Sequence, residues 1–81
     1  MPPPIAPTAP ALGDAVRELR KRRGMSQEQL AAASGLHPTY LSGVEQGNRN
    51  PTWRVLGRLS DALEVRLSDL VKLAEKSDGE R

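Results

Sequence analysis

The stretch SQEQLAAASGLHPTYLSGVEQG, residues 26–47, places the signals for two short helices and a turn in very few residues. Ser26 and Gln29 fit a capping box that starts one helix, and Gly35 provides the left-handed residue that ends it. Pro38 suits the first position of a second helix, which Gly47 closes. A short helix, a turn containing glycine and a second short helix form a unit in which the helices cross steeply.

The crossing of these two helices needs a small residue at the contact and an apolar filling between them. Ala31 is the small residue, and Gly35 accepts a positive φ in the turn without a steric penalty. We expect the wedge between the helices to be filled by Leu30, Leu36, Leu41 and Val44.

Helical signals continue on both sides of this unit. Apolar spacing predicts a helix over about 11–23, and Thr52 and Ser68 can cap two more, over about 52–63 and from 68 onward. Five prolines in residues 1–11 predict an extended or disordered tail. We therefore expect a tail over 1–11, an all-α domain of five helices over 12–76, and a disordered end over 77–81.

The composition excludes several classes of protein. The 81 residues include one His and no Cys, which leaves no disulfide, metal site or cysteine nucleophile, and no paired catalytic groups are evident. We expect no enzyme activity, cofactor or small-molecule substrate. No stretch approaches the ~20 apolar residues of a membrane span, so a cytoplasmic protein is expected. With no Phe, the core must be built from Leu, Val, Ala and Met.

Positive charge gathers toward the N-terminal side of the chain. Residues 1–58 hold eight Lys or Arg against four Asp or Glu, whereas residues 59–81 hold four against six. Five basic residues lie within positions 17–23, opposed only by Glu18. Charge alone leaves two interpretations open, a solvated helix face or a patch that faces a polyanion.

Residues 17–70 resemble the Cro/phage-repressor family of helix-turn-helix proteins, also called the xenobiotic response element family. The resemblance implies a compact, lambda-repressor-like domain that is usually dimeric on double-stranded DNA, with its third helix in the major groove. It rests on several spaced elements taken together: Ser26-Gln27, Leu30-Ala31, Gly35, Leu41-Ser42, Glu45, Gly47, Pro51 and Leu63.

The resemblance implies that the helix beginning at Pro38 contacts bases near its N-terminus. Thr39 can hydrogen-bond a base or pack its methyl group on thymine. Pro38 departs from the family pattern, which often has a long polar residue there. Because proline has no side-chain donor, readout shifts toward Thr39, Tyr40 and groove shape. The expected base-contacting residues are Pro38, Thr39, Tyr40, Ser42 and Gly43.

Phosphate contacts are expected on both flanks of that helix. Gln27 opens the preceding helix, whose free N–H groups can hold a phosphate. The loop GNRNPT, residues 47–52, is rich in donors, although its asparagines also suit ordinary turn chemistry. His37 is expected to serve the helix cap or a phosphate. The expected phosphate-contacting residues are Arg23, Gln27, Gln46, Asn48, Arg49, Asn50 and Thr52.

The remaining assignments concern support of the fold and self-association. The resemblance implies a salt bridge between Arg20 and Glu45 that ties the first helix to the third. We expect Trp53 to pack beneath the fourth helix. The last helix has more apolar residues than so small a domain easily buries, and this predicts a homodimer interface formed by Leu67, Leu70, Val71 and Leu73.

The sequence therefore predicts a dimeric, sequence-specific regulator of transcription that binds a near-palindromic operator. Two alternatives remain open. One is a module of antitoxin or coactivator type that binds a protein partner. The other is a controller of a restriction-modification operon, because such proteins share the TY-x-SG and RN elements found at residues 39–43 and 49–50.

Overall fold

The computed structural model describes residues 5–80, which form five α-helices and no β-strand, so the expected all-α fold class is confirmed. Residues 1–4 and Arg81, which belong to the expected tail and C-terminal end, lie outside the described residues. Within residues 5–80, no helix has the length and apolar character needed to cross a membrane. The helices are α1 (Ala9–Arg22), α2 (Gln27–Ser34), α3 (Pro38–Glu45), α4 (Trp53–Leu63) and α5 (Leu67–Gly79).

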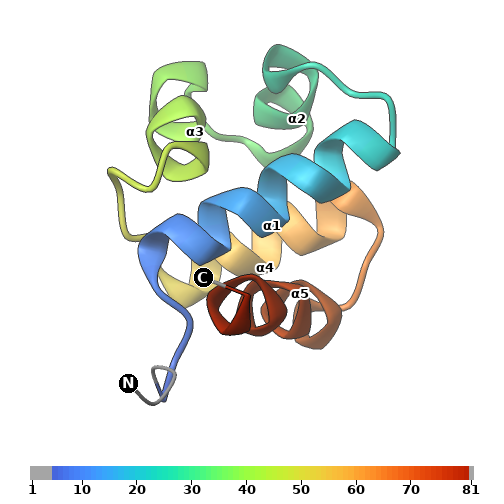
Figure 1. Ribbon diagram of the computed structural model, residues 1–81. Coiled ribbons are helices and arrows are strands. Elements are labelled where there is room, and N and C mark those ends of the chain that lie inside the picture. Colours follow the sequence, from blue (N-terminus) through green and yellow to red (C-terminus); the bar gives the residue numbers. More distant parts are fainter. Residues whose placement is uncertain (1–4, 81) are drawn as a thin grey trace.

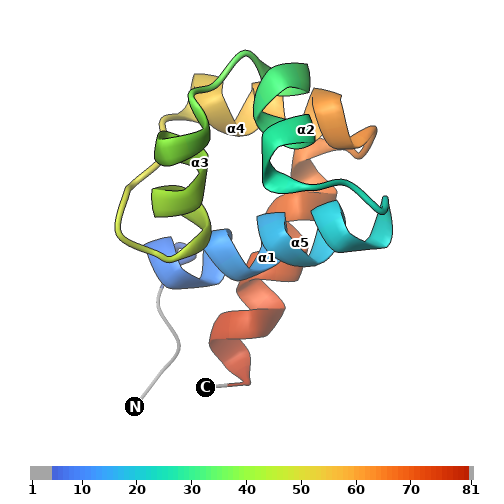
Figure 2. The same ribbon diagram turned by 90° about the horizontal axis from the view of Figure 1, so that it is seen from above.

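Helix α1 runs through the middle of the molecule, with α2 and α3 on one side and α4 and α5 on the other (Figure 1). Seen from above, α2 and α3 lie next to each other, and α4 follows the edge opposite α1 (Figure 2). The core between the helices is aliphatic, as the composition predicts. It consists of Val16, Leu19, Leu30, Ala31, Leu41, Leu56, Leu59, Leu63 and Leu70.

The start and end of α2 follow the signals in the sequence. The Ser26 hydroxyl accepts a hydrogen bond from the Gln29 N–H at 3.1 Å, and the Gln29 side chain accepts one from the Ser26 N–H at 2.8 Å. Gly35 ends the helix with φ of 71°. This left-handed conformation is energetically unfavourable for a residue that has a Cβ atom. The Leu36 N–H then bonds the Ala31 carbonyl at 2.9 Å, which turns the chain toward α3.

The helical domain extends beyond both of its expected boundaries. Helix α1 begins at Ala9 because Thr8 caps it, with its hydroxyl accepting from the Ala11 N–H at 3.3 Å. Helix α5 continues to Gly79, and the Asp78 carboxylate accepts from the Thr8 N–H at 2.9 Å and from the Thr8 hydroxyl at 2.8 Å. Residues 9–11 and 77–79 are therefore helical, stabilised by a contact between residues far apart in the chain.

Two apolar residues, Leu70 and Trp53, lie elsewhere than expected. Leu70, expected in a dimer interface, is fully buried in the core of its own chain. The other three residues expected there, Leu67, Val71 and Leu73, are partly exposed, and Leu67 and Leu73 also pack against the core. Trp53, expected beneath α4, is 74% exposed. Helix α4 buries Leu56, Leu59 and Leu63, and Trp53 lies in the first turn, off that face.

The close approach of α1 to α3 depends on a glycine. A Cβ on Gly13 would lie 2.3 Å from the carbonyl oxygen of Val44 and 2.7 Å from that of Glu45. These are backbone atoms at the end of α3, so they cannot move aside as a flexible side chain would. Gly13 therefore sets the distance between α1 and the C-terminal end of α3.

We predict that Gly13→Ala lowers the free energy of unfolding by about 1–3 kcal/mol, because the added Cβ would clash with the backbone of α3. The clash outweighs the higher helix propensity of alanine. Urea unfolding at low protein concentration measures the change. The matched control is Gly57→Ala, because a Cβ on Gly57 would meet nothing within 4 Å in the described structure. Equal effects of the two substitutions would show that α1 and α3 are not held this closely.

Candidate nucleic-acid interface

Helix α3 has one buried side and one exposed side. Leu41, Val44 and Glu45 are buried, and Glu45 is only 2% exposed. At its start, Nδ1 of His37 accepts a hydrogen bond from the Thr39 N–H at 3.1 Å, so His37 is the N-cap of the helix. The eight residues of α3 therefore present a short, capped helix whose outer side is open to a ligand.

The outer side of α3 and the loop after it form a shallow hollow. Most of the residues expected to contact bases meet here, together with part of the expected phosphate-contacting set. The hollow is lined by Pro38, Thr39, Ser42, Gly43, Gln46, Asn48 and Arg49. Arg49 carries the only formal charge among these residues, so the hollow is suited to an anionic ligand.

Gly43 has a specific role in this hollow. A Cβ at this position would lie 2.8 Å from Cγ of Arg49, so the aliphatic part of the Arg49 side chain crosses directly over the glycine. Gly43 was expected among the base-contacting residues, and the structure shows that it also accommodates a neighbouring side chain. Arg49 is thereby held against α3 although it belongs to the following loop.

Polar side chains along the hollow bond to one another. The Gln46 amide nitrogen donates to the Ser42 hydroxyl at 3.0 Å, and the Asn48 amide nitrogen donates to the Gln46 oxygen at 3.3 Å. All three residues belong to the expected DNA-contacting sets. These bonds join the three side chains to one another and leave further donors and acceptors for a ligand.

The buried side of α3 is fixed by a network centred on the Glu45 carboxylate. Arg20 donates to it twice, from Nε to Oε2 at 2.8 Å and from Nη2 to Oε1 at 3.0 Å. Gln27 donates from its amide nitrogen to Oε1 at 3.0 Å. The ion pair implied by the resemblance is thus present between α1 and α3. The Gln27 hydrogen bond adds α2 to the network. The Glu45 carboxylate raises the pKa of Arg20, chiefly through these hydrogen bonds.

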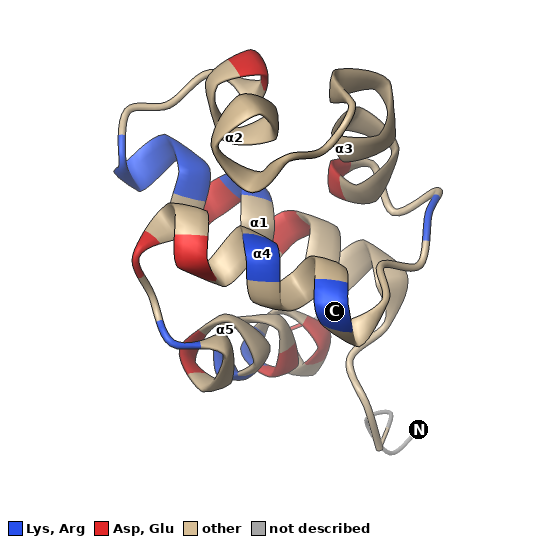
Figure 3. Cartoon of the chain, turned by 180° about the vertical axis from the view of Figure 1, so that it is seen from behind, with Lys and Arg blue, Asp and Glu red and all other residues tan. Residues whose placement is uncertain are grey.

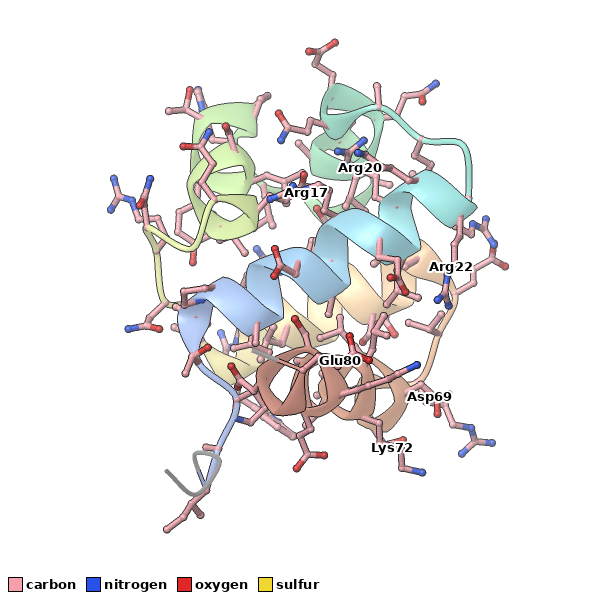
Figure 4. All side chains as sticks on the ribbon, in the orientation of Figure 1. Arg17, Arg20, Arg22, Asp69, Lys72 and Glu80 are labelled. Atoms are coloured by element: carbon pink, nitrogen blue, oxygen red, sulfur yellow. The ribbon has the colours of Figure 1, made fainter. Side chains whose placement is uncertain are left out.

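Two more hydrogen bonds extend this network to the backbone. Nη1 of Arg20 donates to the Met25 carbonyl at 2.9 Å, which holds the turn between α1 and α2. Arg17 donates from Nη2 to the Glu45 carbonyl at 2.9 Å, at the end of α3. Figure 4 shows Arg17 and Arg20 directed from α1 toward α2 and α3. The role of Arg17 was not predicted, and the only sequence signal was its membership of the basic run.

The rest of the basic run also forms ion pairs within the chain. Arg22 pairs with Glu18, and Arg23 pairs with Glu64 at the end of α4. Arg23 was expected to contact phosphate, but its guanidinium is directed away from the hollow toward this carboxylate. Most of the run therefore serves contacts within the domain.

Four further residues with expected DNA contacts lie outside the hollow. Gln27 is engaged with Glu45, and Tyr40 is half-buried at the edge of α3. Thr52 caps α4 by accepting a hydrogen bond from the Val55 N–H at 3.1 Å. Asn50 is exposed in the loop between α3 and α4.

Comparison with known proteins gives a consistent result. A family model for helix-turn-helix proteins matches residues 16–70. The uncharacterized HTH-type transcriptional regulator y4dJ of Sinorhizobium fredii is 42% identical over 60 residues, covering 74% of this chain and 78% of that protein.

Two solved structures are similar over most of their length. The restriction-modification controller protein C.AhdI from Aeromonas hydrophila matches with a TM-score of 0.75 at 40% identity, covering 76% of this chain and 94% of that one. The controller protein C.Esp1396I, solved as a tetramer with its natural 35 base-pair operator, matches with a TM-score of 0.79 at 31% identity, covering 86% and 92% respectively.

We predict that Arg20→Ala destabilises the domain by about 3–5 kcal/mol, because it leaves the buried Glu45 carboxylate without its charged partner. Urea unfolding followed by circular dichroism measures the loss. The control is Arg22→Ala, which breaks an exposed ion pair and should change stability by less than about 1 kcal/mol. A similar, small loss for both variants would show that the Glu45 network does not hold the three helices together.

Proposed function

The chain belongs to the helix-turn-helix family, and we propose that it is a transcriptional regulator that binds double-stranded DNA with α3 in the major groove. The observation that carries the proposal is the hollow along the outer side of α3. An α-helix with its side chains is about 10–12 Å in diameter, so α3 fits a major groove about 12 Å wide. Recognition helices of this kind contact bases through residues near their N-termini.

The charge distribution on α3 supports contact with a polyanion. Glu45 is the only acidic residue of this helix, and it is turned inward to Arg20. Arg49 lies over Gly43 at the rim of the hollow. A duplex placed against α3 would therefore meet a positive side chain without an opposing carboxylate on the same helix.

Base readout is proposed to rest mainly on Thr39 and Ser42. Both have hydroxyl groups in the hollow, and each hydroxyl can donate and accept a hydrogen bond at a base edge. Pro38 adds an apolar surface near the helix start, where a thymine methyl group can pack. Tyr40, half-buried at the edge of α3, is proposed to contact the sugar–phosphate backbone beside these bases.

Phosphate binding is proposed for the loop between α3 and α4. Asn48, Arg49 and Asn50 provide side-chain donors, and Thr52 opens α4, whose N-terminal end favours an anion. Gln46 can reach a phosphate from the end of α3. Gln27 and Arg23 are less suited than the sequence suggested, because both already bond carboxylates within the chain.

We propose that the chain acts as a homodimer on a near-palindromic operator. A dimer places two recognition helices in successive major grooves, about 34 Å apart, and each reads one half-site. The similarity to C.Esp1396I, which was solved as a tetramer on its operator, supports an oligomeric regulator. A DNA-binding role also places the protein in the cytoplasm, at the nucleoid.

A second, narrower candidate is control of a restriction-modification operon. The match covers 94% of the solved chain of the controller C.AhdI, so the similarity includes nearly all of that chain. The operator sequence recovered by selecting bound duplexes from a random pool provides the test. Its occurrence upstream of this protein's own gene, beside genes for an endonuclease and a methyltransferase, would support the narrower role, and its absence there would exclude it.

The proposed function is tested by selecting bound duplexes from a random pool at several salt concentrations. We expect recovery of an inverted repeat, bound with an affinity that falls with salt but persists near physiological ionic strength. Recovery of no inverted repeat, with binding only at low salt, would leave nonspecific attraction to polyanions and favour a module that binds a protein partner.

Two substitutions should separate base contacts from phosphate contacts. Thr39→Ala should relax the base preference at one operator position by about 1–3 kcal/mol. Arg49→Ala should weaken binding to all sequences alike. It should also reduce, by about one, the slope of the logarithm of the binding constant against the logarithm of the salt concentration. Fluorescence anisotropy with operator and scrambled duplexes measures both effects. Equal losses of selectivity for the two variants would mean that the contacts are assigned wrongly.

A further inference from the structure

We propose that two copies of this chain pair through the outer face of α4, with their α4 helices antiparallel. This surface, hereafter the α4 face, consists of Trp53, Arg54, Gly57, Arg58 and Asp61. The inference rests on the proposed function to the extent that a palindromic operator requires a symmetric dimer. Three features of the α4 face are unfavourable within one chain, and pairing with a second copy explains all three.

The first feature is the exposure of Trp53. Its side chain is 74% exposed, and it is one of two large apolar side chains that residues 5–80 leave in solvent. Tryptophan offers a large apolar surface and is enriched at the centres of protein–protein interfaces. Trp53 adds nothing to the core of its own chain and is available to bury against a partner.

The second feature is Gly57, in the interior of α4. Glycine destabilises a helix interior relative to alanine. No packing contact within the chain requires it, because a Cβ there would meet nothing within 4 Å among the described residues outside the helix backbone. In contrast, Gly13 makes room for the backbone of α3. A glycine on an exposed helix face suits the close approach of another molecule.

The third feature is the order of charges along α4. Arg54 lies in the first turn and Asp61 in the last, whereas the helix dipole favours acidic residues at the start and basic residues at the end. Figure 3 shows basic residues along the first part of α4 and acidic residues toward its end. Among the described ion pairs, none includes Arg54, Arg58 or Asp61.

A second copy of the chain matches this order of charges. A two-fold axis beside Gly57 makes the two α4 helices antiparallel, so Arg54 of each copy lies opposite the last turn of the other, beside Asp61. The helix dipoles are then also opposed, which is favourable. Trp53 of each copy lies against the last turn of the other copy's α4. A uniformly acidic partner would match only the basic half of the face.

The position of α4 in the fold is compatible with DNA binding by the dimer. Figure 2 looks down on α2 and α3 and shows α4 along one edge of the molecule. A two-fold axis parallel to this view, beside α4, leaves both α3 helices on the same side. Helix α5 is less suited to the role, because Leu70 is fully buried and Leu67 and Leu73 pack against the core.

Charge reversal tests the pairing in the absence of DNA. Arg54→Asp or Asp61→Arg alone should raise the dimer dissociation constant about tenfold or more, because each places like charges opposite one another twice in the symmetric dimer. The double variant restores opposite charges at both places and should recover most of the affinity. Sedimentation equilibrium over a range of protein concentrations measures the constants, and the exposed Lys72→Glu on α5 is the control.

The rescue by the double variant is the decisive result. Both residues are exposed, so neither reversal disturbs the core. Dissociation constants unchanged in the single variants, or a double variant no better than either, would overturn the α4 pairing. A chain that stays monomeric at every concentration would overturn it too.

A cross-linking measurement gives an independent answer, because the natural chain has no cysteine. Under oxidation, Gly57→Cys should yield a disulfide-linked dimer, whereas Val71→Cys on α5 should remain monomeric. The emission of Trp53, the only tryptophan, should shift to shorter wavelength as the dimer forms. Cross-linking at Val71 in place of Gly57, with no shift in emission, would assign the interface to α5.

Failure of this inference can be distinguished from failure of the proposed function. A dimer that forms through another face would leave selection of an inverted repeat intact. A pool that yields no operator would contradict the proposed function, while the charge-reversal and cross-linking results would still report on pairing of the free protein.

Discussion

The orientation of α3 depends on the neutralisation of one buried carboxylate. Glu45 is 2% exposed, and an unpaired charge at that depth would cost several kcal/mol. A whole small domain is stable by only about 5–15 kcal/mol. Arg20 and Gln27 supply the necessary donors from α1 and α2. Helix α3, whose outer side forms the hollow, is therefore held in place by both helices. The same contacts turn the acidic end of α3 away from the surface assigned to DNA.

Most local features of the fold follow from the sequence, because they depend on neighbouring residues. The capping box at Ser26 and the left-handed turn at Gly35 are formed as predicted. Contacts between distant segments were not predictable in the same way. The bond from Thr8 to Asp78 extends the domain at both ends, and Gly13 allows α3 to approach α1. Neither has a signal in the spacing of nearby residues.

The candidate site was predictable as a set of residues, but not in its internal contacts. Sequence spacing and resemblance placed Thr39 and Arg49 near DNA, and both line the hollow. The contact of Arg49 with Gly43 depends on how the loop folds back over α3. Similarly, Arg23 belongs to a basic run that suggests a polyanion, yet it pairs with Glu64. Which carboxylate a flexible arginine meets is decided by tertiary structure.

The central claim is that the Glu45 network holds α3 in the orientation that reads DNA. Arg20→Lys tests it directly, because lysine keeps the charge but cannot form two parallel hydrogen bonds to the carboxylate. The measurement is the ratio of affinities for the selected operator and a scrambled duplex, at a temperature where the variant is fully folded. The account predicts that this ratio falls, with nonspecific affinity nearly unchanged. A folded variant with an unaltered ratio would contradict it.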